Sequence, residues 1–281
     1  MPDLRSWLQQ ASAQLQAASD TPALDAQVLL AHHLQKPRTW LLANSEQKLN
    51  LQLETALNQA LSQLLNGFPL PYLLGHWEFF GLQFAVSPAV LIPRPETELL
   101  VETALDWLHS HPSRRLAIDI GTGSACIPVT LAKCVSELSI TAVDISRTAL
   151  HLAARNVQVH QVQNQVHLLQ ADLMQPLQAS FDLICSNPPY IPSRKLADLA
   201  VSRYEPALAL DGGTDGLKII TSLLQQASTL LAPGGLMLVE IEADQEEAAR
   251  DLAQHTFPAA RTCILPDLAS HPRLLQIELA D

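Results

Sequence analysis

Basic residues are scarce in this 281-residue sequence. It has 17 Lys and Arg side chains against 28 Asp and Glu side chains, which gives a formal net charge of −11. Broad binding of nucleic acid needs a Lys- and Arg-rich surface that neutralises phosphates, so the composition argues against such a surface. It leaves room for a small basic patch or for a protein partner.

Cysteines and long apolar runs are also few. The four cysteines, Cys126, Cys134, Cys185 and Cys263, lie in apolar stretches, and none forms a Cys-x-x-Cys pair. We therefore expect neither a disulfide framework nor a structural metal site. No window approaches 18 uncharged apolar residues, so no membrane span is expected. The N-terminus lacks the basic and then apolar layout of a signal peptide, which predicts a cytoplasmic protein.

Apolar residues are abundant enough for a large core, at 48% of the chain, and the length suggests one large domain or two smaller ones. Glycine is absent before Gly67. Up to about residue 75, leucines recur at three- and four-residue spacing, which predicts a small helical bundle over residues 1–75. Aromatic and β-branched residues around Gly81 then predict a two-stranded hairpin linker over residues 76–92.

The rest of the chain, residues 93–281, has the pattern of an α/β domain. A proline-rich start predicts a helix from Pro93 to about Ser110. After residue 115, apolar strands alternate with helices, which indicates a doubly wound, mostly parallel sheet with helices on both faces. We expect strands at Leu116–Ile120, Ser139–Asp144, Val166–Gln170, Phe181–Ser186 and Leu236–Ile241, with a final antiparallel pair at Arg261–Leu265 and Leu274–Leu279. We expect helices at Ile127–Val135, Arg147–His160, Leu217–Leu231 and Gln245–Gln254.

A glycine-rich turn follows the first of these strands, at Asp119–Ala125. Gly121 and Gly123 let the backbone approach a ligand closely, and the N-terminus of the next helix favours negative charge. In an open parallel sheet, ligands bind beyond the carboxyl ends of the strands. The turn is therefore a candidate ligand site, although a turn that merely joins strand to helix is the plain alternative.

Carboxylates after the next two strands extend this candidate site. Asp144 can accept hydrogen bonds from two ribose hydroxyls, Asp172 can reach an adenine amino group, and Leu173 can pack against the ring. A dinucleotide is disfavoured because its fingerprint needs a glycine where this chain has Cys126. The spacing instead suits a ligand with an amino-acid end, such as S-adenosylmethionine, with Asp119 helping to hold the amine.

The second motif, Asn187-Pro188-Pro189-Tyr190, directly follows a strand and so lies at the same edge of the sheet. The two prolines donate no N–H and have restricted dihedral angles. The Asn187 side-chain oxygen and the Pro188 carbonyl can then accept both hydrogens of one planar NH2 group. Tyr190 offers an aromatic face on which a flat amide or base can stack. A merely rigid proline loop is the alternative interpretation.

These acceptors suit the methylation of a planar nitrogen. Its lone pair is delocalised, so it is a poor nucleophile, and two aimed acceptors orient it and stabilise the positive charge that grows on it. The methylated nitrogen loses its proton easily, so no strong base is required. We predict Asn187, Pro188 and Tyr190 as catalytic residues, with Pro189 joining them in substrate binding. The predicted cofactor-binding residues are Asp119, Gly121, Thr122, Gly123, Ser124, Ala125, Asp144, Asp172, Leu173 and Asn187.

The sequence resembles the glutamine-N5 methyltransferases that modify peptide chain release factors. Asn-Pro-Pro-Tyr alone also occurs in DNA adenine-N6 methyltransferases, but its combination with Ile92–Glu98 is far more specific. The similar segments are Phe68–Gly75, Glu78–Gly81, Leu91–Glu98, Asp119–Ser124, Ser186–Pro192, Glu205–Gly213 and Pro266–Ala269.

This resemblance implies a class I S-adenosylmethionine-dependent methyltransferase domain and a helical N-terminal domain that helps receive the release factor. The implied substrate is the glutamine of a Gly-Gly-Gln loop. The resemblance also implies that Gly121–Ala125 and Asp144 hold the cofactor, that residues 187–190 bind the glutamine amide, and that Leu173 packs near adenine. We expect a monomer with a release factor as its protein partner, and no DNA, membrane or metal.

Two positions depart from the family pattern, which usually has glycine at Ala125 and at Glu242. We expect the Ala125 methyl group to crowd the amino-acid end of the cofactor, and both departures to bear on affinity more than on chemistry. Two other hypotheses stay open. An adenine-N6 nucleic-acid methyltransferase would use the same acceptors, although the net charge argues against it, and a non-catalytic binding module would explain the two departures.

Two further segments also have two interpretations each. Arg94 and Glu96 line the cofactor entrance, as the resemblance suggests, or serve only the start of a helix. The loop Asp211–Gly216 closes over the site or is an ordinary turn.

Overall fold

The computed structural model describes residues 1–175 and 177–281. Within it the chain divides into two compact units, Met1–His76 and Trp77–Asp281. Across these described residues, no helix combines the length and the apolar character needed to span a bilayer.

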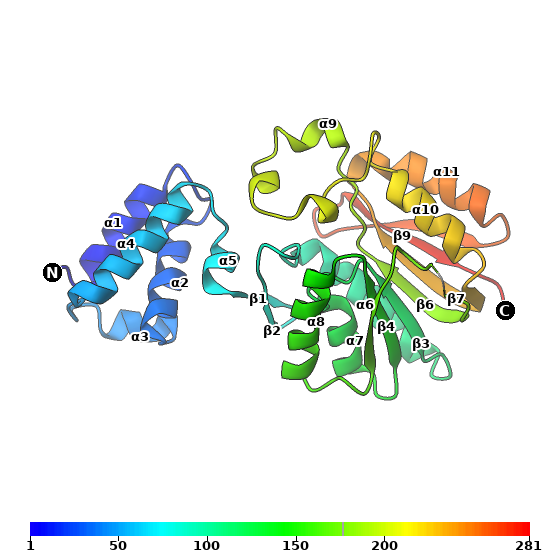
Figure 1. The fold of residues 1–281 in the computed structure, drawn as a ribbon, viewed down its shortest axis with the longest axis horizontal. Helices are drawn as coiled ribbons and strands as arrows, with labels where there is room; N and C mark the ends of the chain where they lie inside the picture. The colour runs from blue at the N-terminus through cyan, green and yellow to red at the C-terminus, as the bar shows by residue number, and fades with distance from the viewer. Residues whose placement is uncertain (176) are drawn as a thin grey trace. The chain divides into compact units, whose positions relative to one another are not determined.

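The first unit is helical, as the leucine spacing predicts (Figure 1). Two of its helices begin at capping side chains, because Asp3 accepts a hydrogen bond from the Ser6 N–H and Asn50 accepts one from the Leu53 N–H, both at 2.8 Å. The leucines on the inner faces are buried, which gives this unit a core of its own. Its helices are α1 (Leu4–Leu15), α2 (Pro22–Leu34), α3 (Arg38–Ala43), α4 (Leu51–Leu65) and α5 (Leu70–Leu74).

A two-stranded hairpin follows, formed by β1 (His76–Phe79) and β2 (Leu82–Ala85). The turn between them is Phe80-Gly81, and both residues have positive φ, at 52° and 70°. The Phe80 N–H donates to Glu98 Oε1 at 2.8 Å, which ties the turn to the start of a helix. A two-stranded hairpin is therefore present, but its second strand ends at Ala85 and not at the predicted boundary, residue 92.

The second unit contains a seven-stranded sheet in the order β5-β4-β3-β6-β7-β9-β8 (Figure 1). The first five strands in this order are parallel, and β9 runs antiparallel to both of its neighbours. This arrangement confirms the predicted mostly parallel sheet. The strands are β3 (Leu116–Ile120), β4 (Ser139–Asp144), β5 (Val166–Gln170), β6 (Phe181–Ser186), β7 (Leu231–Glu240), β8 (Arg261–Pro266) and β9 (Pro272–Glu278).

The largest difference from the predicted strands is in β7, which begins at Leu231 rather than Leu236. Leu231 is already paired with Phe181 of β6, and the register shifts before the regular pairing resumes at Leu236. The Pro233-Gly234-Gly235 stretch is thus an irregular part of the strand, and the preceding helix ends at Ala227 instead of Leu231.

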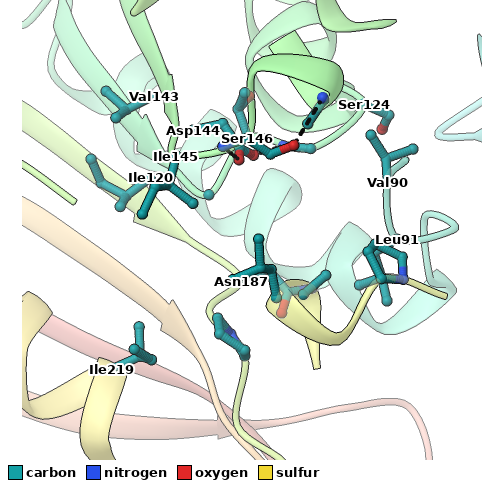
Figure 2. Close-up of a pocket in the computed structure, with 18 of the residues that line it drawn as sticks. Val90, Leu91, Ile120, Ser124, Val143, Asp144, Ile145, Ser146, Asn187 and Ile219 are labelled. Atoms are coloured by element: carbon teal, nitrogen blue, oxygen red, sulfur yellow. Dashed lines mark hydrogen bonds between the residues drawn. The ribbon is translucent and has the colours of Figure 1, made fainter. Parts of the chain in front are cut away.

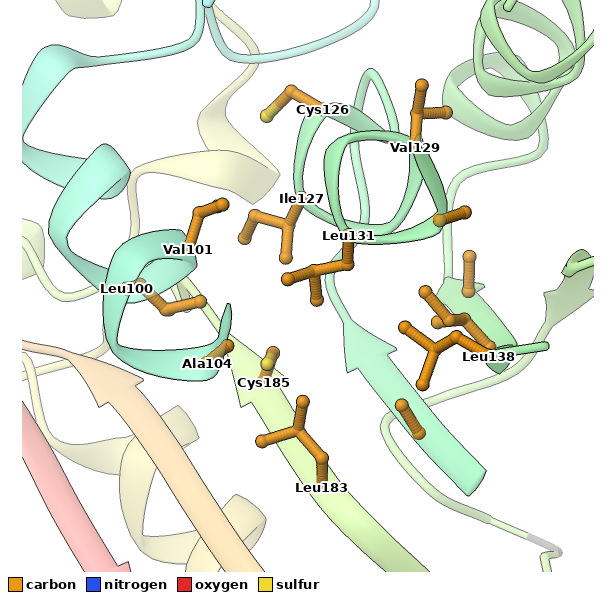
Figure 3. Close-up of a cluster of buried hydrophobic side chains, with 14 of the residues drawn as sticks. Leu100, Val101, Ala104, Cys126, Ile127, Val129, Leu131, Leu138, Leu183 and Cys185 are labelled. Atoms are coloured by element: carbon orange, nitrogen blue, oxygen red, sulfur yellow. The ribbon is translucent and has the colours of Figure 1, made fainter. Parts of the chain in front are cut away.

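Helices cover both faces of the sheet, as a doubly wound fold requires. On one face α6, α7 and α8 pack against Ala117, Leu183 and Cys185, as Figure 3 shows for part of this cluster. On the other face α10 and α11 pack against Ile118 and Ile184. Alternate strand residues therefore belong to opposite cores. The helices are η1 (Pro95–Thr97), α6 (Glu98–Ser110), α7 (Cys126–Cys134), α8 (Arg147–Val159), α9 (Ser193–Leu196), η2 (Ala200–Arg203), η3 (Ala207–Ala209), α10 (Lys218–Ala227), η4 (Ala243–Gln245) and α11 (Glu246–Thr256).

Asn156 on α8 joins the hairpin to the glycine turn. Its Nδ2 donates to the carbonyls of Ser124 and Ala85, at 2.8 and 3.1 Å, and its Oδ1 accepts from the Ala85 N–H at 2.8 Å. The residue is buried, so these bonds replace water around both segments. The glycine turn is consequently held from behind by a fully paired amide.

Candidate active site

A cavity of about 400 Å³ lies at the carboxyl edge of the parallel strands (Figure 2). Its walls come from the turns after β3, β4, β5 and β6, and from the segment before α6. Both the size and the place are typical of small-molecule sites in open α/β sheets. The cavity is thus where the two sequence motifs predict a site.

The glycine turn and the Asn-Pro-Pro-Tyr turn meet at this cavity. Gly121 and Gly123 have φ of 75° and 53°, and both line the cavity. The N–H groups of Gly121 and Thr122 both donate to the Val143 carbonyl at 2.9 Å, which fixes the turn to β4. A Cβ atom at Gly121 would lie 3.9 Å from the carbonyl oxygen of Asn187. A side chain at Gly121 would therefore contact the second motif, and both motifs line the same cavity.

Asp144 is anchored at the end of β4. Its Oδ2 accepts from the Gly123 N–H at 2.9 Å, and its Oδ1 accepts from the Ser146 N–H at 2.8 Å. Figure 2 shows Asp144 and Asn187 on different sides of the cavity. Each carboxylate oxygen can accept more than one hydrogen bond, so Asp144 keeps acceptor capacity toward a ligand.

Asp119 lies behind the glycine turn and does not line the cavity. It is 1% exposed, and burial, together with the charge of Asp144, raises the pKa of its carboxyl to about 7. The nearby Thr122 hydroxyl lowers this pKa, but neither group makes a hydrogen bond of ordinary geometry with the residues that the structure describes. An unpaired carboxyl beside a backbone cradle fits a ligand that carries a positive charge.

The four residues of the second motif have different surroundings. Asn187 and Pro189 line the cavity, whereas Pro188 and Tyr190 do not. Pro188 is buried, and Tyr190 packs against the apolar cluster below α10. Burial raises the pKa of the Tyr190 hydroxyl. Only the first and third positions of the motif therefore face the cavity directly.

Most of the predicted cofactor-binding residues line the cavity, and two do not. Asp119 and Ala125 lie outside the lining, and the Ala125 side chain is buried in the apolar core. Its methyl group therefore does not crowd the cavity as expected. The replacement of glycine by alanine affects the backbone conformation instead. Ala125 has a left-handed φ of 62°, which glycine adopts more easily. The predicted residues that do line the cavity are Gly121, Thr122, Gly123, Ser124, Asp144, Asp172, Leu173 and Asn187.

Glu242, the other departure from the family pattern, also lies outside the cavity lining. It forms a capping box with Gln245, in which the Glu242 N–H donates to Gln245 Oε1 at 3.1 Å. The Gln245 Nε2 then donates to the carbonyls of Tyr190 and Gly216, at 3.0 and 3.1 Å. Glu242 therefore supports the backbone of the second motif.

The loop Asp211–Gly216 braces the same backbone. The Ile191 N–H donates to the Leu210 carbonyl at 3.0 Å, and the Gly212 N–H donates to the Ile191 carbonyl at 2.9 Å. A Cβ atom at Gly216 would lie 2.2 Å from the Tyr190 carbonyl oxygen, so only glycine fits there. The loop is thus not an ordinary turn, and it supports the second motif rather than simply closing over the site. Asp211 of this loop also lines the cavity.

Arg94 lines the cavity, and Glu96 does not. The Arg94 guanidinium pairs with the carboxylate of Glu205, which is 5% exposed, and the second oxygen of Glu205 accepts from the Ile92 N–H at 3.1 Å. This contact fastens the segment that contains Pro206–Ala209, another part of the cavity wall. Sequence reasoning missed Glu205 as a site residue, because its partner lies 111 positions away.

Two buried polar residues that sequence reasoning also missed support Asn187. Thr97 accepts a hydrogen bond from Asn187 Nδ2 at 2.9 Å and donates one to Glu240 Oε2 at 2.7 Å. Burial raises the pKa of the Glu240 carboxyl to about 7. The sequence offered one signal for Glu240, because it is a polar residue at the end of a buried apolar strand, β7.

Over residues 1–175 and 177–281, no cluster of three or more His, Cys, Asp or Glu side chains could hold a metal ion.

Comparison with known proteins adds independent findings. A family model described as the PrmC N-terminal domain matches residues 6–75, and one described as the methyltransferase small domain matches residues 95–204. The release factor glutamine methyltransferase of Moorella thermoacetica is 41% identical over 273 residues, which cover 96% of each chain. That of Escherichia coli is 39% identical over 253 residues, which cover 88% of this chain and 89% of that one.

A solved structure shares the fold at lower sequence identity. The ribosomal protein L11 methylase of Lactobacillus delbrueckii subsp. bulgaricus aligns with a TM-score of 0.51 and 18% identity. The alignment covers 73% of this chain and 90% of that chain. This likeness concerns the fold alone.

The close packing of Gly216 against Tyr190 can be tested by substitution. Gly216→Ala should lower the free energy of unfolding by about 3 kcal/mol, because the new methyl group overlaps a backbone oxygen and the φ of 82° is left-handed. Gly81→Ala is the matched control, since Gly81 has φ of 70° with nothing within 4 Å of its Cβ position, and should cost about 1 kcal/mol. Urea unfolding measures both, and equal losses would contradict the brace.

Proposed function

Because the chain belongs to the family of release factor glutamine methyltransferases, we propose that it methylates N5 of the glutamine in the Gly-Gly-Gln loop of a peptide chain release factor. The fold is that of class I S-adenosylmethionine-dependent methyltransferases, and S-adenosylmethionine is the cofactor that the family implies. The observation that carries the proposal is that the glycine turn and Asn187 line one cavity, which puts a cofactor cradle beside an amide-binding turn.

The residues around the cavity fit this cofactor. The backbone of Gly121–Ser124 presents no side chain larger than Thr at the turn, and Asp144 keeps free acceptor sites for ribose hydroxyls. Asp172 and Leu173 line the part of the cavity that we assign to adenine. The unpaired carboxyl of Asp119 supplies negative charge from behind the turn, and we place the amino-acid end of the cofactor on the cavity side of the same turn. Ala125 contributes only the backbone of the helix start. When bound, the cofactor supplies an electrophilic methyl group on a sulfonium.

The second motif would bind the substrate amide. The Asn187 side-chain oxygen and the Pro188 carbonyl accept the two N–H groups of the glutamine side chain, and Pro189 stiffens the turn and lines the cavity. Two fixed acceptors hold the nitrogen in line with the methyl group and stabilise the charge that develops there. The proton then leaves from an acidic, methylated nitrogen without a dedicated base. In this proposal Tyr190 supports the turn from outside the cavity lining, where it packs against the apolar cluster.

The domain assignments belong to the same proposal. Residues 1–75 would help to recognise the release factor, residues 76–92 would act as the hairpin linker, and residues 93–281 would carry the chemistry. We also propose a monomeric, cytoplasmic enzyme without DNA, membrane or metal as a partner.

The two other hypotheses have less support. Adenine also presents a flat amino group, but a net charge of −11 does not suit broad contact with nucleic acid, and the curated relatives are named for release factors. A non-catalytic module relied on Ala125 and Glu242, and neither side chain lines the cavity.

Methyl transfer from labelled S-adenosylmethionine tests the proposal. We expect label on a purified release factor, and none on the same factor with the loop glutamine changed to alanine. Label that persists on the alanine variant would exclude this substrate. Label on DNA or RNA offered in parallel reactions would instead support the adenine hypothesis.

Cofactor affinity separates the roles of two turn residues. Gly121→Ala should weaken S-adenosylmethionine binding about tenfold or more, because Gly121 lines the cavity and its left-handed φ of 75° is strained for a residue with a side chain. Ala125→Gly should change the affinity by less than about threefold, because Ala125 does not line the cavity. Titration calorimetry measures both, and a larger effect for Ala125→Gly would contradict the assignment.

A further inference from the structure

We propose that Thr97 and Glu240 are positioning residues that determine which end of the Asn187 side-chain amide faces the substrate. This inference rests on the proposed function, in which the Asn187 oxygen accepts a hydrogen bond from the substrate amide. Neither Thr97 nor Glu240 needs to touch the cofactor or the reacting nitrogen for this role.

Three elements bring the residues together. Asn187 follows β6, Glu240 ends the neighbouring β7, and Thr97 ends η1, just before α6. The Asn187 Nδ2 and Thr97 Oγ1 are 2.9 Å apart, and Thr97 Oγ1 and Glu240 Oε2 are 2.7 Å apart. Thr97 is 3% exposed and Glu240 is 2% exposed, so water does not compete for these bonds.

The chemistry of the three groups gives the chain of hydrogen bonds one direction. An ionised carboxylate only accepts, so the single hydroxyl proton of Thr97 must go to Glu240. Thr97 Oγ1 then has only lone pairs left for Asn187, and it must face the NH2 end of the amide. The Asn187 oxygen is consequently turned away from Thr97 and is available to a ligand in the cavity that Asn187 and Thr97 both line.

The direction matters because the two ends of an amide have nearly the same shape. If the Asn187 amide were reversed, its NH2 group would face the NH2 group of the substrate glutamine. Two donors cannot form a hydrogen bond, so the nitrogen would lose one of its two acceptors and its orientation toward the methyl group. A device that fixes the amide therefore bears on turnover rather than on the shape of the cavity.

Protonation of Glu240 removes this constraint. A neutral Glu240 can donate to Thr97 Oγ1, and the Thr97 proton can then turn to the Asn187 oxygen and stabilise the reversed amide. Burial, with a smaller contribution from the charge of Glu96, raises the pKa of Glu240 to about 7, although the Thr97 hydrogen bond and the charges of Arg273 and Arg94 act in the opposite direction. The reversed form should therefore gain population as the pH falls through about 7.

Activity variants test the relay. We expect Thr97→Val to lower kcat for release factor methylation at least tenfold, with the KM for S-adenosylmethionine changed less than about threefold, because the isosteric side chain neither donates nor accepts. Thr97→Ser keeps the hydroxyl and should keep kcat within about threefold. Thr103→Val, which removes a hydroxyl bonded to the Leu99 carbonyl within α6, is the matched control and should leave kcat unchanged.

The pH dependence of kcat adds a signature that loss of structure does not give. At saturating S-adenosylmethionine, which removes any effect of Asp119 on binding, the kcat of the wild type should fall as the pH drops below about 7. Glu240→Gln should remove this acid limb, because glutamine does not titrate. An unchanged kcat in Thr97→Val, equal losses in Thr97→Val and Thr97→Ser, or an acid limb that persists in Glu240→Gln would each overturn the inference.

A measurement without turnover keeps this inference separate from the proposed function. The side-chain NH2 signals of Asn187 in the ¹⁵N-labelled protein, assigned by their loss in Asn187→Asp, should shift as the pH crosses about 7. They should not shift in Glu240→Gln. Signals that do not titrate in the wild type would overturn the relay, even if the protein methylates its substrate. An inactive wild type with titrating signals would instead reject the proposed function alone.

Discussion

The site depends on two adjacent parallel strands, β3 and β6, that end side by side. Their register pairs Ile120 with Ser186, and the Ser186 hydroxyl donates to the Ile120 carbonyl at 2.8 Å. The residues that follow are the glycine turn and Asn187, so the sheet itself brings a cofactor cradle and an amide-binding turn into contact. A Cβ atom at Gly121 would lie 3.9 Å from the Asn187 carbonyl oxygen.

Buried polar groups hold this arrangement, and almost all of those around the site are paired. Asn156 fixes the glycine turn from behind, Gln245 holds the Tyr190 carbonyl, and Thr97 holds the Asn187 amide. Pairing matters because an unsatisfied buried polar group is costly, and because paired groups have one defined orientation. Among the residues around the site that the structure describes, Asp119 and Thr122 depart from this rule. Thr122 lines the cavity on the side where we put the charged end of the cofactor, and Asp119 lies behind the same turn.

Sequence reasoning predicted the strands, both motifs and the place where they meet. It could do so because hydrophobic periodicity and the turn preferences of glycine and proline are local properties of the sequence. It could not predict Glu205 or Glu240 as site residues, because each acts through a partner more than a hundred positions away. It also expected Ala125 to crowd the cavity, although backbone geometry turns that side chain into the core. The start of β7 was missed because Pro-Gly-Gly suggests a turn, whereas pairing with β6 keeps it in the sheet.

The central claim is that the Asn187 side chain presents an oriented acceptor to the reacting nitrogen. A single-turnover comparison of the wild type and Asn187→Ala, with the cofactor affinity of both measured alongside, tests it most directly. The account predicts a methyl-transfer rate at least 10²-fold lower in the variant, with the fold intact and the affinity for S-adenosylmethionine changed only a few fold. An equal transfer rate in the two proteins would contradict it.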